Sequence, residues 1–161
     1  MNRARHQARH QARREGLASA AQVEALADQL VAVADALHAR VMHAVGNGDG
    51  QFSEAEQAAA RALLEDEQML RASASGLYAD AARYVVQALG QSQDHLLHLT
   101  AQAAEKIRTI GHIAEAGALV GAILGLAAAL ASGRVPAIIA AIDKVSRQAE
   151  KIGAGEPNKA A

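Results

Sequence analysis

The chain has 161 residues, of which 51% are hydrophobic but only 2% aromatic, and 42 are alanine. Alanine is the best helix former and occupies little volume, so this composition favours one domain of closely packed helices over a sheet or a deep pocket. The net charge is −1, and the absence of cysteine excludes disulfides and thiolate metal sites.

The first 16 residues form a basic segment. Five arginines precede the first acidic residue, Glu15, so they contribute a charge of +5, while the remainder, with 11 basic and 17 acidic residues, carries −6. A four-residue repeat would place Arg5, Arg9 and Arg13 on one stripe of a helix. Anionic lipid, an acidic protein or, least favoured, nucleic acid would suit such a stripe. The other interpretation is a solvated chain end with no binding role.

Two further features of this segment concern ligands and localisation. His6 and His10 stand at i and i+4, but no third ligand is nearby, so a metal site is not expected. No apolar stretch follows the basic residues, so the sequence shows no secretory signal peptide. We therefore expect a cytoplasmic protein or one exported by another route, and membrane association stays open.

Residues 17–44 have the pattern of a long amphipathic helix. Its apolar residues recur at three- and four-residue spacing and form one face: Val23, Leu26, Leu30, Val33, Leu37 and Val41. Because such a face must be covered, the pattern predicts packing against a further helix.

The twelve residues from Val45 to Glu56 have the spacing of a calcium-binding loop. Such loops place oxygen ligands at positions 1, 3, 5, 7, 9 and 12 around the ion and a glycine at position 6. The candidate ligands are Asn47, Asp49, Gln51, Ser53 and Glu56, with Gly50 at the turn. The stretch resembles an EF-hand, with one departure: position 1 holds Val45 where the family has aspartate. The resemblance implies calcium as the ligand, and only two carboxylates imply weak binding.

The same residues also fit a metal-free turn. Ser53 followed three residues later by Glu56 is a capping box, which starts a helix without any metal. Gly48, Asp49 and Gly50 are common turn residues. No second loop of this spacing occurs in the chain, although EF-hands generally work in pairs. Both interpretations stay open at the level of the sequence.

Two more helices are expected before residue 110. One runs from Ser53 to about Ala72 and ends at a cluster of small residues, Ser73, Ser75 and Gly76. Its acidic run, Glu65, Asp66 and Glu67, is interpreted as a solvated face and not as a catalytic pair. The next helix starts near Leu77, is weakened at Gly90 and continues to Ile110. Within it, His95 and His98 are expected at the surface or the core edge, not as metal ligands.

The stretch from Ala116 to Ser132 has no charged residue over 17 positions. Gly117, Gly121 and Gly125 recur every fourth residue, so they line one helix face where another backbone can approach closely. Each glycine inside a helix costs about 1 kcal/mol relative to alanine. Three on one stripe therefore indicate a groove filled by a partner helix, and we expect these glycines to mediate self-association.

This stretch is expected to begin an apolar helical hairpin, in which Gly133 ends the first helix and Pro136 takes the first position of the next. Seventeen residues at ~1.5 Å each span ~25 Å, just short of the ~30 Å hydrocarbon core of a bilayer. A helix that is apolar on all sides also suits the centre of a soluble bundle. The hairpin is therefore a buried core or oligomer seam, or a segment that enters a membrane conditionally; a constitutive anchor is least favoured.

The sequence as a whole predicts an all-α protein, an alanine-rich bundle of five or six helices that ends in the hairpin. Four regions are expected: the basic segment 1–16, a bundle with the EF-hand-like helix–loop–helix at 17–110, the hairpin at 111–152 and a disordered tail at 153–161. No phosphate-binding glycine loop, H-E-x-x-H, Glu-x-x-His pair or nucleophile motif occurs, so no enzyme is expected.

These features together predict a helical interaction protein whose apolar hairpin drives self-association or conditional entry into a membrane. In architecture alone it is comparable to small helical effectors and pore-forming proteins. The alternative is a soluble calcium-responsive module, in which the loop from Val45 to Glu56 sets the angle between two helices and exposes an apolar face.

Overall fold

The computed structural model describes residues 17, 19–46, 53–86 and 96–154 of the chain. Within these residues it contains five α-helices, two short 3-10 helices and no strand, so the prediction of an all-α protein is confirmed. The α-helices are α2 (Ala20–Gly46), α3 (Glu54–Ala79), α4 (Leu96–Thr109), α5 (Ala116–Ser132) and α6 (Val135–Ala154). The 3-10 helices are η1 (Ala81–Tyr84) and η3 (Ile113–Glu115).

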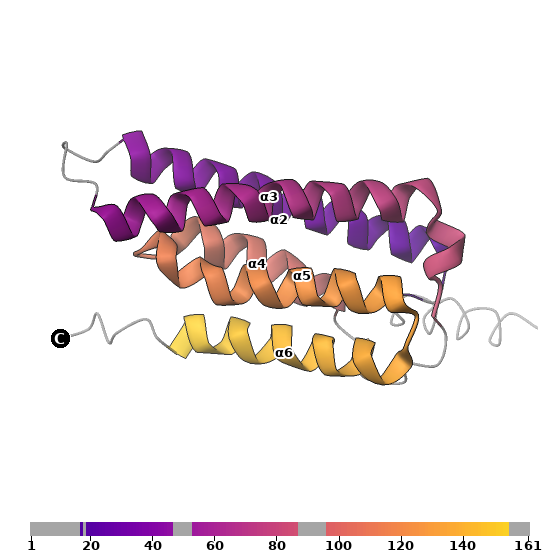
Figure 1. Cartoon of the computed structure of the whole chain (residues 1–161). Coiled ribbons are helices and arrows are strands. Elements are labelled where there is room, and N and C mark those ends of the chain that lie inside the picture. The colour runs from indigo at the N-terminus through magenta and orange to yellow at the C-terminus, as the bar shows by residue number, and fades with distance from the viewer. Residues whose placement is uncertain (1–16, 18, 47–52, 87–95, 155–161) are drawn as a thin grey trace, which may run out of the picture.

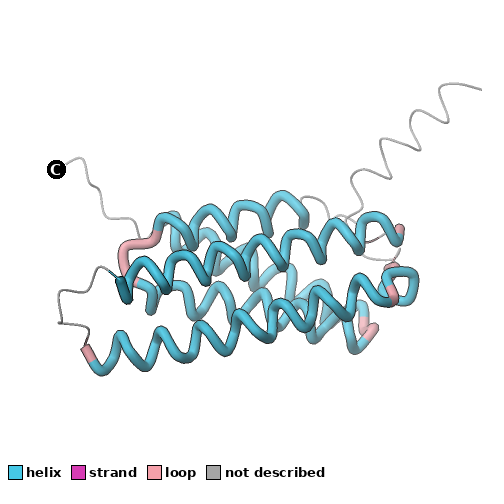
Figure 2. Tube along the Cα trace, turned by 90° about the horizontal axis from the view of Figure 1, so that it is seen from above, coloured by secondary structure: helices cyan, strands magenta, loops and turns pink. Residues whose placement is uncertain are grey.

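The helices lie side by side along one common direction (Figure 1, Figure 2). α2 packs extensively against both α3 and α4, while α5 packs most extensively against α6. The two groups meet where α3 contacts α5 and where α4 contacts α6. Figure 1 accordingly shows α2 and α3 at one edge of the bundle, α4 and α5 in the middle and α6 at the other edge.

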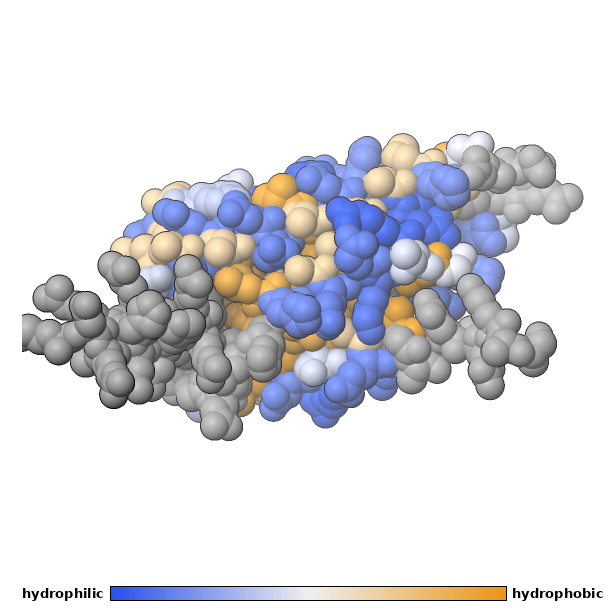
Figure 3. All heavy atoms as spheres, turned by 180° about the vertical axis from the view of Figure 1, so that it is seen from behind, coloured by the Kyte–Doolittle hydropathy of each residue, from blue (hydrophilic) through white to orange (hydrophobic). Residues whose placement is uncertain are grey.

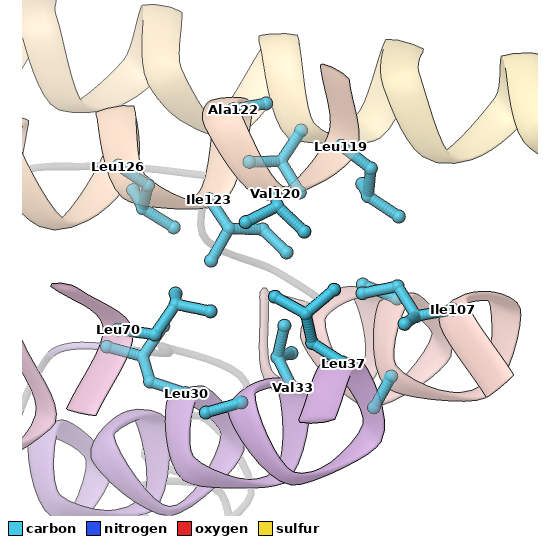
Figure 4. Close-up of a cluster of buried hydrophobic side chains, with 14 of the residues drawn as sticks. Leu30, Val33, Leu37, Leu70, Ile107, Leu119, Val120, Ala122, Ile123 and Leu126 are labelled. Carbon is cyan, nitrogen blue, oxygen red and sulfur yellow. The ribbon is translucent and has the colours of Figure 1, made fainter. Parts of the chain in front are cut away.

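The apolar face predicted for α2 forms the centre of the core. Its members are at most 1% exposed: Val23, Leu26, Leu30, Val33, Leu37 and Val41. Figure 4 shows Leu30, Val33 and Leu37 directed toward Val120 and Ile123 of α5. Because burying one such side chain contributes ~1.5–3 kcal/mol, this face is a main source of the bundle's stability.

α3 is longer than the sequence predicts. It continues past Ser73, Ser75 and Gly76 to Ala79. Ala74 and Leu77 are only 1% and 4% exposed, so the core face of the helix extends through this stretch. The Ser75 hydroxyl donates to the Arg71 carbonyl at 3.0 Å, a bond that a helix accommodates. Burial of the apolar face therefore outweighs the low helix propensity of serine and glycine.

The helix predicted from Leu77 to Ile110 is consequently wrong in its first part. Leu77 belongs to α3, which is followed by η1, and the described part of α4 is Leu96–Thr109. Gly90 and His95 lie outside the described residues. The second part agrees with the prediction, and His98 is exposed, with Nε2 3.1 Å from Nε2 of Gln102.

Two helix boundaries follow directly from their capping residues. Ser53 is the N-cap of α3, and its Oγ accepts a hydrogen bond from the Glu56 amide at 3.1 Å, which confirms the predicted cap. Gly133 has φ 68°, a left-handed conformation that favours glycine, and its amide donates to the Leu130 carbonyl as α5 ends. α6 begins at Val135, so Pro136 takes its second position and not the first.

Few large hydrophobic side chains are exposed. Among the described residues they are Met42, Val45, Met69 and Tyr78. Figure 3 shows the face opposite to that of Figure 1, where hydrophilic residues cover much of the surface and hydrophobic ones show between them. Exposed apolar surface therefore has to be sought among smaller side chains.

Candidate functional site

α5 has an inner face of bulky residues and an outer face of small ones. The inner residues Leu119, Val120, Ile123 and Leu126 are at most 1% exposed, and Figure 4 shows them turned toward the core. On the other side of the helix, four exposed residues define the outer face of α5: Ala118, Gly121, Gly125 and Ala128. Gly117 lies half-buried at its border. Because both faces of α5 are apolar, its sequence distinguishes them only by the size of their side chains.

The three glycines do not hold α5 against another helix of the described residues. A methyl group built on Gly117, Gly121 or Gly125 would meet no heavy atom of its surroundings within 4 Å. The cost of about 1 kcal/mol per helical glycine is therefore not offset by close packing within the described chain. The expected self-association remains a prediction, and the structure places two of its three glycines at the surface.

α5 is also unusual because it has an exposed side but carries no charge. No charged residue occurs in Ala116–Ser132. The stretch Ile113–Ser132 is long and apolar enough to cross a membrane, and half of its most apolar window is buried inside the bundle. The core helix of a soluble protein meets the same criterion, so this property alone does not decide between bundle and membrane.

α6 differs from α5 because it is amphipathic. Its core residues include Ile138, Ile142 and Val145. Charged residues occupy its exposed side: Asp143, Lys144, Arg147, Glu150 and Lys151. Only the first half of the predicted apolar hairpin is therefore apolar on all sides.

A buried acidic side chain lies between α2 and α3. Glu67 is only 3% exposed, which corrects the prediction that residues 65–67 form a solvated face; Glu65 is exposed and Asp66 is half-buried. The reason is helical spacing, since Glu67 shares a face with the core residues Leu63 and Leu70. Burial, and to a lesser extent the charge of Glu65, raise the pKa of Asp66.

Basic side chains surround the Glu67 carboxylate. Nδ1 of His38 lies 2.5 Å from Oε1 and 3.3 Å from Oε2 of Glu67. Only the contact with Oε2 has hydrogen-bond geometry, so Oε1 is buried without a hydrogen bond. Nη2 of Arg71 lies 3.7 Å from Oε1 and donates to Oδ1 of Asp35 at 2.8 Å. This cluster links α2 with α3.

The outer face of α5 is thus an exposed surface on a helix that has no charged residue. No protein family, curated protein or solved structure matches this chain. The function therefore has to be inferred from the geometry of the bundle itself.

The candidate calcium ligands lie largely outside the described residues. Asn47, Asp49 and Gln51 fall there, whereas Ser53 and Glu56 are described and exposed. Within the described ranges, no group of three or more histidine, aspartate or glutamate side chains is placed to hold a metal ion. Also outside the described residues are the candidate residues of the basic segment, Arg5, Arg9 and Arg13 together with His6 and His10.

Proposed function

We propose that this chain is a non-enzymatic helical interaction protein that associates with a second copy of itself through the outer face of α5. The observation that carries the proposal is a row of open glycines on a helix without any charged residue. Exposed apolar surface on a folded domain is a common feature of interaction sites. Because small residues let backbones approach closely, two such faces can pack against each other.

A second copy suits this face better than a charged partner would. A two-fold axis brings the same patch of both subunits together, so the surface only has to complement itself. α5 contributes no charged side chain to such a contact, so no charge has to be desolvated at its centre. The charged residues of α6, which packs beside α5, would remain at the rim.

Sedimentation velocity across a range of protein concentrations tests this proposal. Gly121→Gln adds a long, uncharged side chain to the middle of the outer face, where the monomer has room for it. We expect the variant to stay folded, because glutamine is a better helix former than glycine, and to remain monomeric at concentrations where the natural chain dimerises. Gly76→Gln is the matched control, since Gly76 is an exposed helical glycine on α3 with equally open surroundings.

Three results bear on the proposal in opposite directions. Loss of the dimer in Gly121→Gln, with a dimer retained in Gly76→Gln, supports it. A natural chain that is monomeric at all concentrations overturns it, and so does a dimer that Gly121→Gln leaves intact.

A second function, conditional membrane insertion of the α5–α6 hairpin, rests on a different observation. The stretch Ile113–Ser132 has the length and apolar character of a membrane span, and α5 contacts α6 more extensively than it contacts the other helices. The hairpin could therefore leave the bundle as a unit. Release of dye from anionic vesicles by the natural chain tests this function, and the absence of release with and without calcium counts against it.

The calcium-responsive module is the alternative to both functions. It is favoured by the helix–loop–helix arrangement, because α2 ends at Gly46, α3 begins at Glu54 and the two helices pack along each other. In this alternative, calcium at the loop would alter that packing.

A further inference from the structure

A basic depression opens at the end of the bundle where α2 and α4 approach their C-termini. It has a volume of about 360 Å³ and is lined by Ala39, Arg40, His43, Arg108 and Ile110. Three of these five residues are basic and none is acidic. The depression lies apart from the residues that define the outer face of α5, so it calls for a separate explanation.

Arg40 is fixed in this depression without being neutralised. Its Nε and Nη2 donate to the Ile110 carbonyl at 3.2 and 3.1 Å, and Nη2 also donates to the Gly111 carbonyl at 3.1 Å. No carboxylate of the described residues forms an ion pair with it. Its Nη1 takes no part in these bonds. The guanidinium is therefore held in one orientation, and no carboxylate of the described residues offsets its positive charge.

Arg108 reaches the same depression from α4. Its Nη1 bonds to Oε1 of Glu105, one turn earlier in the helix, which leaves Nε and Nη2 outside that contact. The Glu105 side chain is 70% exposed, so solvent screens its charge. His43, in the last turn of α2, is the third basic residue of the lining. Two helices thus contribute basic side chains to one small space.

We propose that this depression binds a phosphate group. A phosphate carries up to about two negative charges and three strong acceptor oxygens, so it can accept bonds from donors on both helices at once. Arginine forks are well matched to phosphate oxygens, and a guanidinium that is already oriented loses little freedom on binding. The phosphate is either a free anion or the headgroup of an anionic lipid, and the chemistry of the site is the same for both.

A simpler role for these cations has to be separated from ligand binding. Basic side chains near helix C-termini offset the partial negative charge of the carbonyls there, and Arg40 donates to two carbonyls just after the end of α4. That role alone predicts no saturable phosphate binding. The two accounts therefore differ in a measurable quantity.

The first experiment is a titration of the full chain with inorganic phosphate, followed by amide chemical shifts at constant ionic strength. We expect saturable shifts around Arg40 and Arg108 with a Kd on the order of 1 mM. Arg108→Gln removes one charged donor and should weaken binding about tenfold or more. Arg83→Gln, at an exposed arginine of η1 outside the depression, is the matched control and should leave the Kd unchanged.

Arg40 requires a gentler substitution because it also holds the chain after α4. Arg40→Lys keeps the positive charge but loses the fork, so we expect weaker phosphate binding in a protein whose circular dichroism is unchanged. Amide chemical shifts that change with phosphate concentration without reaching saturation overturn the proposal. So does an equal loss of binding in Arg108→Gln and Arg83→Gln, since it would show a general charge effect.

Flotation with vesicles distinguishes the two sources of phosphate. If the natural ligand is a lipid headgroup, the chain binds phosphatidic acid vesicles better than phosphatidylcholine vesicles. Arg108→Gln then reduces this binding more than Arg83→Gln does. Phosphate binding without any such difference on vesicles supports a soluble phosphate compound. Both arms keep the basic N-terminal segment in place, and neither depends on the dimer proposed for α5.

Discussion

Glu67 carries a carboxylate into the contact between α2 and α3, where its charge has to be balanced by neighbouring side chains. His38 is its nearest partner, and Arg71 lies slightly farther away and is shared with Asp35. The side chains of His38 and Arg71 are 51% and 37% exposed, whereas that of Glu67 is 5% exposed. Removing the basic partner and removing the buried acid should therefore have different consequences.

His38→Ala is expected to destabilise the fold by about 1–3 kcal/mol, because it leaves a buried carboxylate without its nearest partner. In a Glu67→Leu background the same substitution should cost less than about 0.5 kcal/mol, since an exposed histidine side chain then has nothing to balance. Urea denaturation of the four proteins in this double-mutant cycle measures both quantities. Equal costs in the two backgrounds would show that the contact contributes no coupling.

The hydrogen bond of Tyr78 makes the stability of the folded state depend on pH. Its hydroxyl donates to Oδ1 of Asp28, and this bond, with smaller effects of burial and of the charges of Asp28 and Glu24, raises the pKa of Tyr78 to about 12. The folded state therefore keeps a proton that the unfolded state loses near pH 10. The contribution of Tyr78 to the stability of the folded state is fully present below pH 10 and is lost as the pH rises through about 12.

The measurement is an ultraviolet titration of phenolate in the natural chain and in Asp28→Asn. We expect the substitution to lower the pKa of Tyr78 toward its usual value. The chain has one other tyrosine, Tyr84, whose titration is isolated in Tyr78→Phe. A Tyr78 pKa that Asp28→Asn does not move would contradict the role of the hydrogen bond.

Helical elements in this protein are fixed by caps at some ends and by packing at others. Ser53 starts α3 through its own side chain, whereas α3 passes through Ser73–Gly76 because Ala74 and Leu77 are buried. α5 shows the same balance as the end of α3, since its buried inner face holds the helix in the core although three glycines lower its helix propensity. Local propensity decides an element only where tertiary packing does not oppose it.

The loop between α2 and α3 carries the element-scale prediction. With two carboxylates and Val45 at position 1, we expect calcium binding no tighter than ~10⁻⁴ M by calorimetry. Val45 is 49% exposed in the last turn of α2, so Val45→Asp should not disturb the core. If the loop is an EF-hand, that change tightens binding.

The absence of calcium heat after Val45→Asp would leave the N-cap as the sole role of Ser53. Ser53→Ala should then cost about 0.5–2 kcal/mol in thermal or urea denaturation, with the same value in calcium and in chelator. A calcium-dependent cost would instead indicate that Ser53 acts in the loop as well.

Packing in the core of the bundle opposes movement of α5 out of it. Its inner face packs in the same core cluster as Leu30, Val33 and Leu37 of α2 (Figure 4). Insertion of the α5–α6 hairpin into a membrane would first have to expose these residues to water. Under the membrane proposal, the stability of the core therefore controls how readily the hairpin leaves the bundle.

Leu30→Ala tests this relation at the scale of the whole molecule. Leu30 is 1% exposed, so its truncation should destabilise the fold by about 2–5 kcal/mol. If the hairpin enters membranes, the same variant should release dye from anionic vesicles faster than the natural chain. Met69→Ala, at a residue that is 55% exposed on α3, should change neither property. Lower stability without faster release would count against insertion.

The sequence by itself determined the features that depend on local chemistry and helical spacing. The core face of α2, from Val23 to Val41, follows from three- and four-residue spacing of apolar residues. The start of α3 at Ser53 and the end of α5 at Gly133 follow from capping, because each residue satisfies its helix end with its own atoms. These properties need no knowledge of distant neighbours.

Only the tertiary structure decided which side of each helix meets which neighbour. The partner of the buried Glu67 carboxylate is His38, 29 residues away, and the fixed guanidinium of Arg40 depends on the carbonyl of Ile110, 70 residues away. The glycines of α5 likewise have a spacing that the sequence reveals, but their open surroundings follow from the placement of the other helices. Apolar residues on every side of α5 give no preferred direction for burial. Packing of its bulky side chains into the core shared with α2 and α3 selected the face that remains outside.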